Sequence, residues 1–158
     1  MTAGDEVQLV TFRVGGHDFA VNIFQVERIL RYQNPAPLPK APAFLEGVVR
    51  YGDAVVPLMD LRKRVDLEAP VREETRIMIL ELDGEKIGVV VDAVQEVLRV
   101  SAERISPPAS IVRGLAAKYI NGVVVDGDRT LVLLQVSKLL SSKERLALEK
   151  LEVEASHE

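Results

Sequence analysis

Acidic and imidazole side chains are the groups in this sequence that could carry acid–base or metal chemistry. The two histidines, His17 and His157, lie in a predicted turn and in the C-terminal tail, and neither has a partner at the spacing typical of metal ligands. Both are predicted to be solvated surface residues. The serine-nucleophile and glycine-rich phosphate motifs of common enzyme families do not occur. Cysteine is absent, which excludes disulfides, zinc thiolates and thiol chemistry.

Four aspartates remain as candidates for catalysis: Asp53, Asp60, Asp92 and Asp128. Two carboxylates can divide the roles of acid and base between them. However, Asp53 and Asp128 follow a hairpin glycine, where aspartate stabilises turns through its own side chain. Asp60 precedes Leu-Arg-Lys-Arg and can cap or pair locally. We therefore predict no enzymatic activity, no cofactor and no metal. An enzymatic or small-ligand β-barrel domain using Asp53 and Asp60 is the alternative from another class.

The elements that would position any site are repeated along the chain. Residues 47–61 (GVVRYGDAVVPLMDL) and 122–136 (GVVVDGDRTLVLLQV) are identical at six of fifteen positions. Residues 16–31 and 84–99 share a glycine, two valines, a leucine and an arginine at equivalent positions. Each half therefore has the same order: a strand, a glycine turn, a second strand, a segment ending in arginine, a proline-containing connection and a Gly-Val-Val hairpin.

The composition predicts an all-β fold with an aliphatic core. The chain has 24 valines against 4 phenylalanines, 3 tyrosines and no tryptophan, and β-branched side chains favour strands. Gly15-Gly16 and Asp83-Gly84 favour two-residue hairpins. A repeat of about 60–70 residues cannot bury enough apolar surface alone. The sequence therefore predicts two small barrels packed against each other, with a seam lined by equivalent positions of both halves.

The boundary between the halves is expected at residues 72–75 (Arg-Glu-Glu-Thr), with an exchange of strands between the halves left open. Four prolines mark an irregular connection over residues 35–42. Ser141 and Glu144 have the spacing of a capping box, which predicts a short C-terminal helix over 144–158 with a frayed end.

Charge gives no support to a nucleic-acid or membrane partner. The net charge is -4 and aromatic residues make up 4% of the chain, whereas single-strand binding needs stacking aromatics in a positive groove. Arg62, Lys63 and Arg64 with Arg72 and Arg76 form at most a small basic patch. The N-terminus lacks the features of a signal peptide. We expect a cytoplasmic protein with no direct membrane contact.

An apolar, strand-borne surface is the remaining candidate site. Val26 and Ile29 lie next to the charged Glu27 and Arg28. Two interpretations stay open from these residues: Val26 and Ile29 belong to the core, or they form part of a surface that binds another protein.

Three segments resemble the CheW-like family of bacterial chemotaxis adaptors: GHDFAVNIFQVERIL, PAFLEGVVRYGDAVVPLMDLR and IGVVVDAVQEVL. The resemblance covers residues 7–143 in the family's order and spacing. It implies two five-stranded, SH3-like β-barrels on a shared core, and no enzymatic activity. It also implies two partners within a two-component signalling system: the regulatory domain of the histidine kinase CheA, and the cytoplasmic helical-hairpin tip of chemoreceptors (methyl-accepting chemotaxis proteins).

The resemblance also implies a receptor-binding groove along the junction between the barrels. Val26 and Ile29 match its apolar lining, and Val97 and Val100 from the second half are weaker matches. A helical hairpin would insert its apolar ridge there.

A second implied site couples the kinase and the receptor, and comprises Gly47, Val48, Arg50, Gly52 and Asp53. The family pattern after Gly47 is usually Gly-Val-x-Asn-Leu-Arg-Gly, so Gly52 stands at the usual arginine and Asp53 at the usual glycine. Three interpretations of this departure stay open. In the first, Arg50 supplies the charge, because it lies two residues earlier on the same face of a regular strand. In the second, the chain is a divergent paralogue that serves a pili or gliding chemosensory system, and in the third, the hairpin has only adopted a different turn.

Overall fold

Ten strands follow one another in two sets of five in the computed structural model, which describes residues 5–64, 70–107, 119–141 and 144. The first set is β1 (Glu6–Val14), β2 (His17–Asn22), β3 (Val26–Arg31), β4 (Leu45–Tyr51) and β5 (Ala54–Asp60). The second set is β6 (Arg76–Leu82), β7 (Glu85–Val91), β8 (Ala93–Ser101), β9 (Ile120–Asp126) and β10 (Arg129–Leu134). The short helices are α1 (Leu61–Arg64), η1 (Ile23–Gln25), η2 (Ala102–Arg104) and η4 (Val136–Lys138). The all-β prediction is confirmed.

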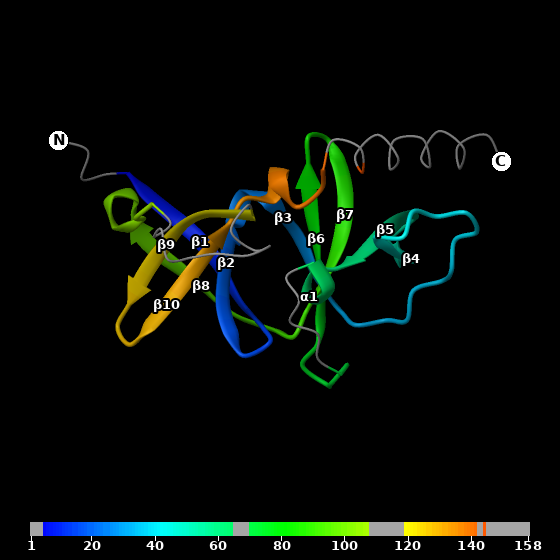
Figure 1. Ribbon diagram of the computed structural model, residues 1–158, viewed down its shortest axis with the longest axis horizontal. Coiled ribbons are helices and arrows are strands. Elements are labelled where there is room, and N and C mark those ends of the chain that lie inside the picture. Colours follow the sequence, from blue (N-terminus) through cyan, green and yellow to red (C-terminus); the bar gives the residue numbers. More distant parts are fainter. Residues whose placement is uncertain (1–4, 65–69, 108–118, 142–143, 145–158) are drawn as a thin grey trace.

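The strands form two five-stranded sheets, and each half of the chain contributes to both. Sheet A has the order β8-β1-β2-β10-β9, and sheet B has the order β3-β6-β7-β5-β4. Sheet A lies to the left and sheet B to the right in Figure 1. Each sheet combines the first two strands of one half with the last three of the other. In each sheet the two contributions are joined by one parallel pair, β2–β10 or β5–β7, and one antiparallel pair, β1–β8 or β3–β6.

The chain changes sheet twice, between β2 and β3 and between β7 and β8. Residues 72–75, predicted as the boundary between the halves, lie between β5 and β6, which belong to the same sheet. That position therefore divides the sequence repeats but not the sheets. The sequence repeat indicates the order of the strands along the chain. Which strands pair with each other depends on how the two halves pack together. Strands of both halves are present in each sheet.

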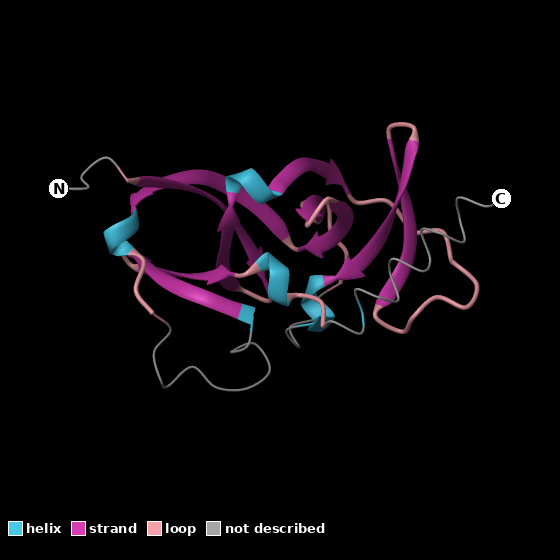
Figure 2. Cartoon of the chain, turned by 90° about the horizontal axis from the view of Figure 1, so that it is seen from above, coloured by secondary structure: helices cyan, strands magenta, loops and turns pink. Residues whose placement is uncertain are grey.

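Alternate faces of the strands divide the core into three clusters. One lies within sheet A, one within sheet B, and the largest, the shared cluster, draws residues from both sheets. The strands curve around these interiors in Figure 2. The shared cluster takes equivalent residues from β1 and β6: Val10 and Met78, Phe12 and Leu80, Val14 and Leu82. The prediction of two small β units on a shared aliphatic core is confirmed.

The predicted capping box closes the described part of the C-terminal region. The backbone N–H of Glu144 donates to Ser141 Oγ at 3.1 Å, and the N–H of Ser141 donates to Glu144 Oε1 at 2.9 Å. These reciprocal bonds are the signature of a helix N-terminus. The helix and frayed end predicted beyond Glu144, together with His157, lie outside the described residues.

Candidate functional site

Asp60, the first catalytic candidate, is held in a buried ion pair with Arg62; both side chains are 7% exposed. The guanidinium of Arg62 donates from Nε to Asp60 Oδ1 and from Nη2 to Asp60 Oδ2, and both donor–acceptor distances are 2.9 Å. The backbone N–H of Arg62 donates to Oδ1 at 3.0 Å, which caps the start of α1. These hydrogen bonds to Asp60 are the main reason that the pKa of Arg62 is raised. Asp60 thus pairs locally, as the sequence predicted.

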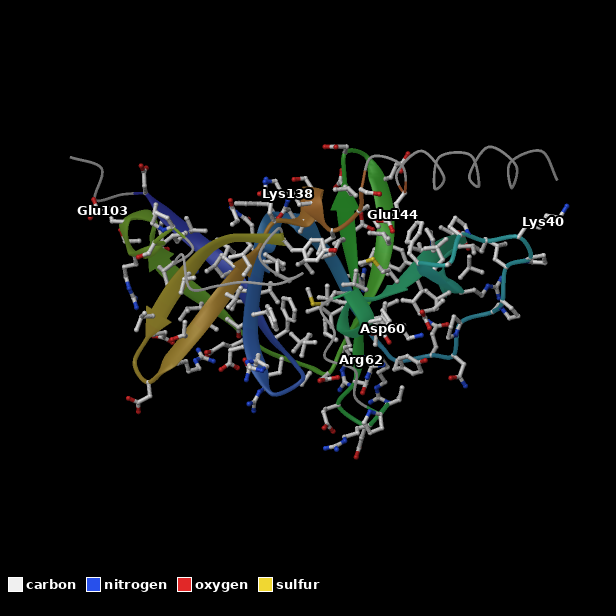
Figure 3. All side chains as sticks on the ribbon, viewed as in Figure 1. Lys40, Asp60, Arg62, Glu103, Lys138 and Glu144 are labelled. Carbon is white, nitrogen blue, oxygen red and sulfur yellow. The ribbon has the colours of Figure 1, made fainter. Side chains whose placement is uncertain are left out.

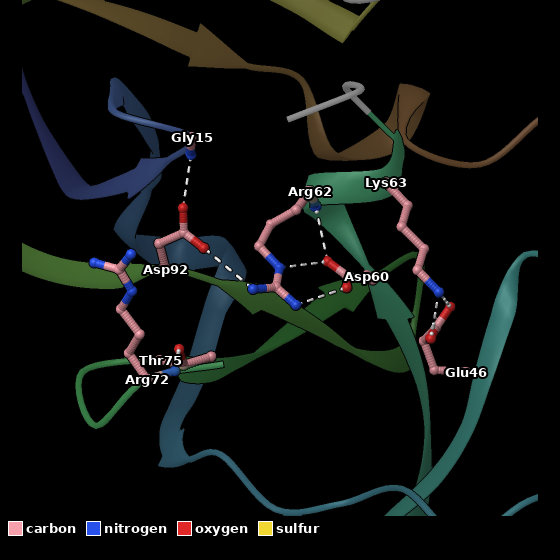
Figure 4. A network of polar contacts seen from close by, with 8 residues as sticks. All are labelled: Gly15, Glu46, Asp60, Arg62, Lys63, Arg72, Thr75 and Asp92. Carbon is pink, nitrogen blue, oxygen red and sulfur yellow. Dashed lines mark hydrogen bonds and ion pairs between the residues drawn. The ribbon is translucent and has the colours of Figure 1, made fainter. Parts of the chain in front are cut away.

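Arg62 extends this pair into a connection between the sheets. Its Nη1 donates to Asp92 Oδ1 at 3.3 Å, and the other oxygen of Asp92 accepts the backbone N–H of Gly15 at 2.6 Å (Figure 4). Asp92 lies where the chain crosses from β7 to β8, and Gly15 lies in the β1–β2 turn. Asp60 ends β5 and Arg62 lies in α1, and Figure 3 places both near the middle of the molecule. We call Gly15, Asp60, Arg62 and Asp92 the inter-sheet clasp.

The other catalytic candidates do not assemble into a site. Asp53 and Asp128 are exposed in the β4–β5 and β9–β10 turns, and His17 is exposed at the start of β2. A hollow of about 450 Å³ lies beside Asp92, but neither Asp53 nor Asp60 lines it. Within the described residues, no cluster of three or more acidic or histidine side chains could hold a metal ion.

The four residues predicted to line a groove lie on β3 and β8, the first strands after each change of sheet. Val26 and Ile29 are on β3, an edge of sheet B, and Val97 and Val100 are on β8, an edge of sheet A. Ile29 is 39% exposed and its repeat equivalent Val97 is 51% exposed; we call these two residues the exposed aliphatic pair. Val26 is half-buried against the shared cluster. Val100 is 2% exposed within sheet A and has almost no surface to offer a partner.

A β-bulge at equivalent positions explains why the pair points outward. Glu27 has no partner in the β3–β6 register, and Gln95 has none in the β1–β8 register. Before the bulge, Val26 and Val94 pack against the shared cluster. After it, the strands turn to cover the interiors of their own sheets. A bulge bends a strand and re-aims the side chains that follow, which exposes one aliphatic residue on each strand.

Gly47 of the implied coupling site is buried and has a packing role. Its φ is +140°, and a Cβ at this position would lie 2.3 Å from the carbonyl oxygen of Ala36. That carbonyl accepts the N–H of Val48 at 2.9 Å, and the N–H of Ala36 donates to the carbonyl of Val48 at 2.8 Å. Gly122, the repeat equivalent, is also crowded: a Cβ there would lie 2.7 Å from Ile105 Cγ2 and 3.1 Å from the carbonyl oxygen of Ser106. Glycine is required here so that the preceding connection can bridge to β4.

Arg50, Gly52 and Asp53 are exposed at the end of the β4–β5 hairpin. The strand ends at Tyr51, and Gly52 has a φ of +61° in the turn. The regular alternation that would place Arg50 and position 52 on one strand face therefore stops before position 52. Arg50 lies opposite Val55, which is 61% exposed. The outer face of this hairpin thus carries a cation beside an aliphatic side chain.

Sequence reasoning missed a polar cluster that joins three strands of sheet B. Lys86 Nζ lies 3.0 Å from Glu27 Oε2 and 5.5 Å from the centre of the Tyr51 ring. A hydrogen bond from Tyr51, and then one from Lys86, hold the pKa of Glu27 below its usual value. The three residues are far apart in the sequence and belong to no motif, so only the strand order could have brought them together.

The fold and these surfaces define a β-rich scaffold: two β units on a shared core, with buried charges used for structure and aliphatic residues exposed on equivalent edge strands. The sequence matches the CheW-like domain family over residues 8–144. The chain therefore belongs to the CheW-like family, whose members are non-catalytic adaptors of chemotaxis.

Individual relatives agree with this assignment. The chain is 35% identical over 150 residues to the chemotaxis protein CheW of Treponema pallidum (strain Nichols), covering 91% of this chain and 88% of that protein. It is 32% identical over 149 residues to protein FrzA of Myxococcus xanthus, covering 92% of each. The crystal structure of the scaffolding protein TtCheW from Thermoanaerobacter tengcongensis superposes with a TM-score of 0.79 at 25% identity, covering 87% of this chain and 94% of that one.

Among the described residues, none of the helices has the length and hydropathy that a membrane span requires.

Proposed function

We propose that this protein is a cytoplasmic adaptor that couples chemoreceptors to the histidine kinase CheA within membrane-associated receptor arrays. Family membership supports an adaptor role, and the exposed aliphatic pair is the structural observation that carries the proposal. Ile29 and Val97 are large apolar side chains left in solvent on strands whose other aliphatic residues are buried or partly buried. Exposed apolar surface can mark a protein-binding site, and equivalent positions of the two halves expose it here.

The receptor partner is the helical-hairpin tip of a chemoreceptor. An amphipathic helix binds a groove through apolar residues spaced along one face. Ile29 and Val97 would supply the outer contacts, and Val26, half-buried on the shared cluster, would form the base beside them. Because Val26 also packs against the core, a charge at position 26 would disturb both the fold and the binding.

The kinase partner is the regulatory domain of CheA, and the outer face of the β4–β5 hairpin is the surface we assign to it. Arg50 and Val55 lie opposite each other there, with Gly52 and Asp53 at the tip. A cation beside an exposed aliphatic residue suits an interface that is apolar at its centre and polar at its rim.

Calorimetry with a cognate receptor tip and with the kinase's regulatory domain tests the proposal. Replacing Ile29→Asp or Val97→Asp should weaken receptor binding by about 2 kcal/mol or more, the usual cost of losing a hot-spot contact. Val125→Asp is the matched control, because Val125 is 61% exposed on β9, away from the pair. Unchanged receptor binding by both pair variants would contradict the assignment of the groove. Failure of the native protein to bind either partner would contradict the adaptor function.

Arg50 provides a test of the coupling surface. If its charge replaces the arginine usual at position 52, Arg50→Ala should impair receptor control of the kinase, and Gly52→Arg in that background should restore it. Normal kinase control by Arg50→Ala would remove Arg50 from the mechanism.

A pili or gliding chemosensory system is the second candidate, favoured by Gly52 at the position where the family usually has arginine. The same calorimetry, carried out with receptors of each type, decides between the two.

A further inference from the structure

Two arginines face each other across the β3–β6 pair. Arg31, the last residue of β3, lies opposite Arg76, the first residue of β6. Like charges placed directly opposite on paired strands destabilise a sheet. A third arginine, Arg72, approaches from the turn that precedes β6. Repulsion between these arginines lowers the stability of the free protein unless neighbouring groups offset their charge.

All three arginines line one small cleft of about 280 Å³, and Arg72 also lines the hollow beside Asp92. Tyr32 and Val71 add apolar walls, and Val71 is 48% exposed. The turn that carries Arg72 is closed by two hydrogen bonds with Thr75: the N–H of Arg72 donates to Thr75 Oγ1 at 2.8 Å, and the N–H of Thr75 donates to the carbonyl of Arg72 at 3.2 Å. Thr75 is 1% exposed, so this turn is anchored in the core.

The cleft carries positive charge that the described residues do not neutralise. Arg76 Nη1 donates to the carbonyl oxygens of Glu73 at 2.8 Å and Thr75 at 3.0 Å. These bonds orient the guanidinium but leave its charge uncompensated. Within the described part of the chain, Arg31, Arg72 and Arg76 form no ion pair with a carboxylate. Glu73 is the single acidic residue among three arginines in the lining.

We propose that this cleft binds an oxyanion, carboxylate or phosphate, carried on a side chain of an acidic segment of another protein. Guanidinium groups bind carboxylate and phosphate through paired hydrogen bonds, and clusters of arginine are a recurring means of recognising acidic or phosphorylated segments. The apolar walls fit the methylene groups of a glutamate. The volume is at the lower limit of pockets for small molecules, about 300 Å³, which suits one or two side chains. The inference does not depend on the adaptor function.

The test uses the full-length protein at low ionic strength and three probes: a fluorescent oligoglutamate peptide, a phosphoserine peptide and inorganic phosphate. Arg31→Gln and Arg72→Gln should each weaken peptide binding about tenfold, the effect of losing one charge-assisted hydrogen bond. Arg99→Gln is the control, because Arg99 is 69% exposed on the other sheet, and it should bind as the native protein does.

A second measurement separates a binding role from a structural one. Because Arg31 faces a like charge, Arg31→Gln should raise the thermal unfolding midpoint at low salt while binding falls, and added salt should shrink that gain. Tighter binding of the oligoglutamate or of the phosphoserine peptide identifies the oxyanion of the natural segment. The proposal is overturned if no probe binds, if the variants bind peptide as well as the native protein does, or if inorganic phosphate binds as tightly as both peptides.

Discussion

Arg62 is a buried cation shared by two carboxylates, Asp60 at the start of α1 and Asp92 at the crossing from β7 to β8. A buried charge pair adds little net stability over a well-packed apolar substitute, but removal of one member leaves the other charge buried and unpaired. The clasp therefore contributes most by fixing the position of α1 and the β1–β2 turn relative to each other.

Replacing Arg62→Met should lower the free energy of unfolding by about 3–5 kcal/mol, the cost of leaving a buried charge without its partner. Urea unfolding followed by circular dichroism measures this, since the chain has no tryptophan to report by fluorescence. Lys63→Met is the neighbouring control. Its ion pair with Glu46 is exposed and should contribute less than about 1 kcal/mol. If Arg62→Met and Lys63→Met lowered the free energy of unfolding equally, the inter-sheet clasp would stabilise the fold no more than an exposed ion pair does.

Gly47→Ala should lower the free energy of unfolding by about 3 kcal/mol or more, because it combines a strained φ with a clash against the backbone of Ala36. Gly52→Ala shares the positive φ but meets nothing within 4 Å, so it should cost about 1–2 kcal/mol. Thermal unfolding of the two variants makes the comparison. A smaller loss at Gly47 than at Gly52 would refute the packing role of Gly47.

For single residues, the sequence predicted hydrogen bonds and ion pairs between near neighbours in the chain but missed those between distant residues. The pairing of Asp60 with its neighbours and the capping box of Ser141 and Glu144 follow from residues two or three positions apart, and both are present. The contact between Arg62 and Asp92 joins the segments that follow β5 and β7, two strands whose pairing the sequence does not state. No periodicity or motif signals it.

A single extra residue, the bulge, changes which side chains of the edge strands β3 and β8 face solvent. Alternation predicts which residues share a strand face, but a bulge resets that alternation partway along the strand. The sequence left Val26 and Ile29 as either core or surface for this reason. The structure divides them, with Val26 against the shared cluster and Ile29 exposed. Hairpin turns, in contrast, are set by adjacent residues and were predictable.

Glu27, at the bulge of β3, should make stability depend on pH. Its pKa is lowered in the folded protein by Tyr51 and Lys86, so its contribution is present above the unfolded value of about 4.3 and is lost as pH falls through the folded value. Glu27→Gln should therefore be less stable than the native protein at pH 7, and the difference should disappear in acid below that range. Urea unfolding across this range measures it.

The control for this prediction is Glu103→Gln, because Glu103 is exposed in η2 and remote from the Lys86 cluster. This variant controls for the removal of one exposed surface carboxylate. A Glu27→Gln difference that stayed constant from neutral pH into acid would contradict the role assigned to the Glu27 carboxylate.

For the whole molecule, the class of fold was predictable because both halves carry the same aliphatic pattern. The exchange of strands was not decided by that pattern. A β3 paired within its own half and a β3 paired with β6 would satisfy the same alternation, so the sequence places the boundary at 72–75 while the sheets divide elsewhere. Only the complete set of contacts in the shared cluster selects one arrangement.

The exchanged arrangement predicts how fragments behave. Residues 1–74 contain two strands of sheet A and three of sheet B but complete neither, so this fragment should show no cooperative unfolding by circular dichroism. Mixing it with residues 75–158 should restore native-like strand content and a cooperative transition. Independent cooperative folding of the first fragment would mean that its strands can pair within one half.

The pairing of β1 with β8 has a further consequence during synthesis. Val7 lies opposite Val100, and Phe19 opposite Val132 in the parallel pair. β1 and β2 can pair with each other early, but their other neighbours, β8 and β10, are synthesised only after the greater part of the polypeptide. Long sequence separations of this kind slow folding, so β1 and β2 spend translation as uncovered aliphatic segments, and the nascent chain should depend on chaperones more than its small size indicates.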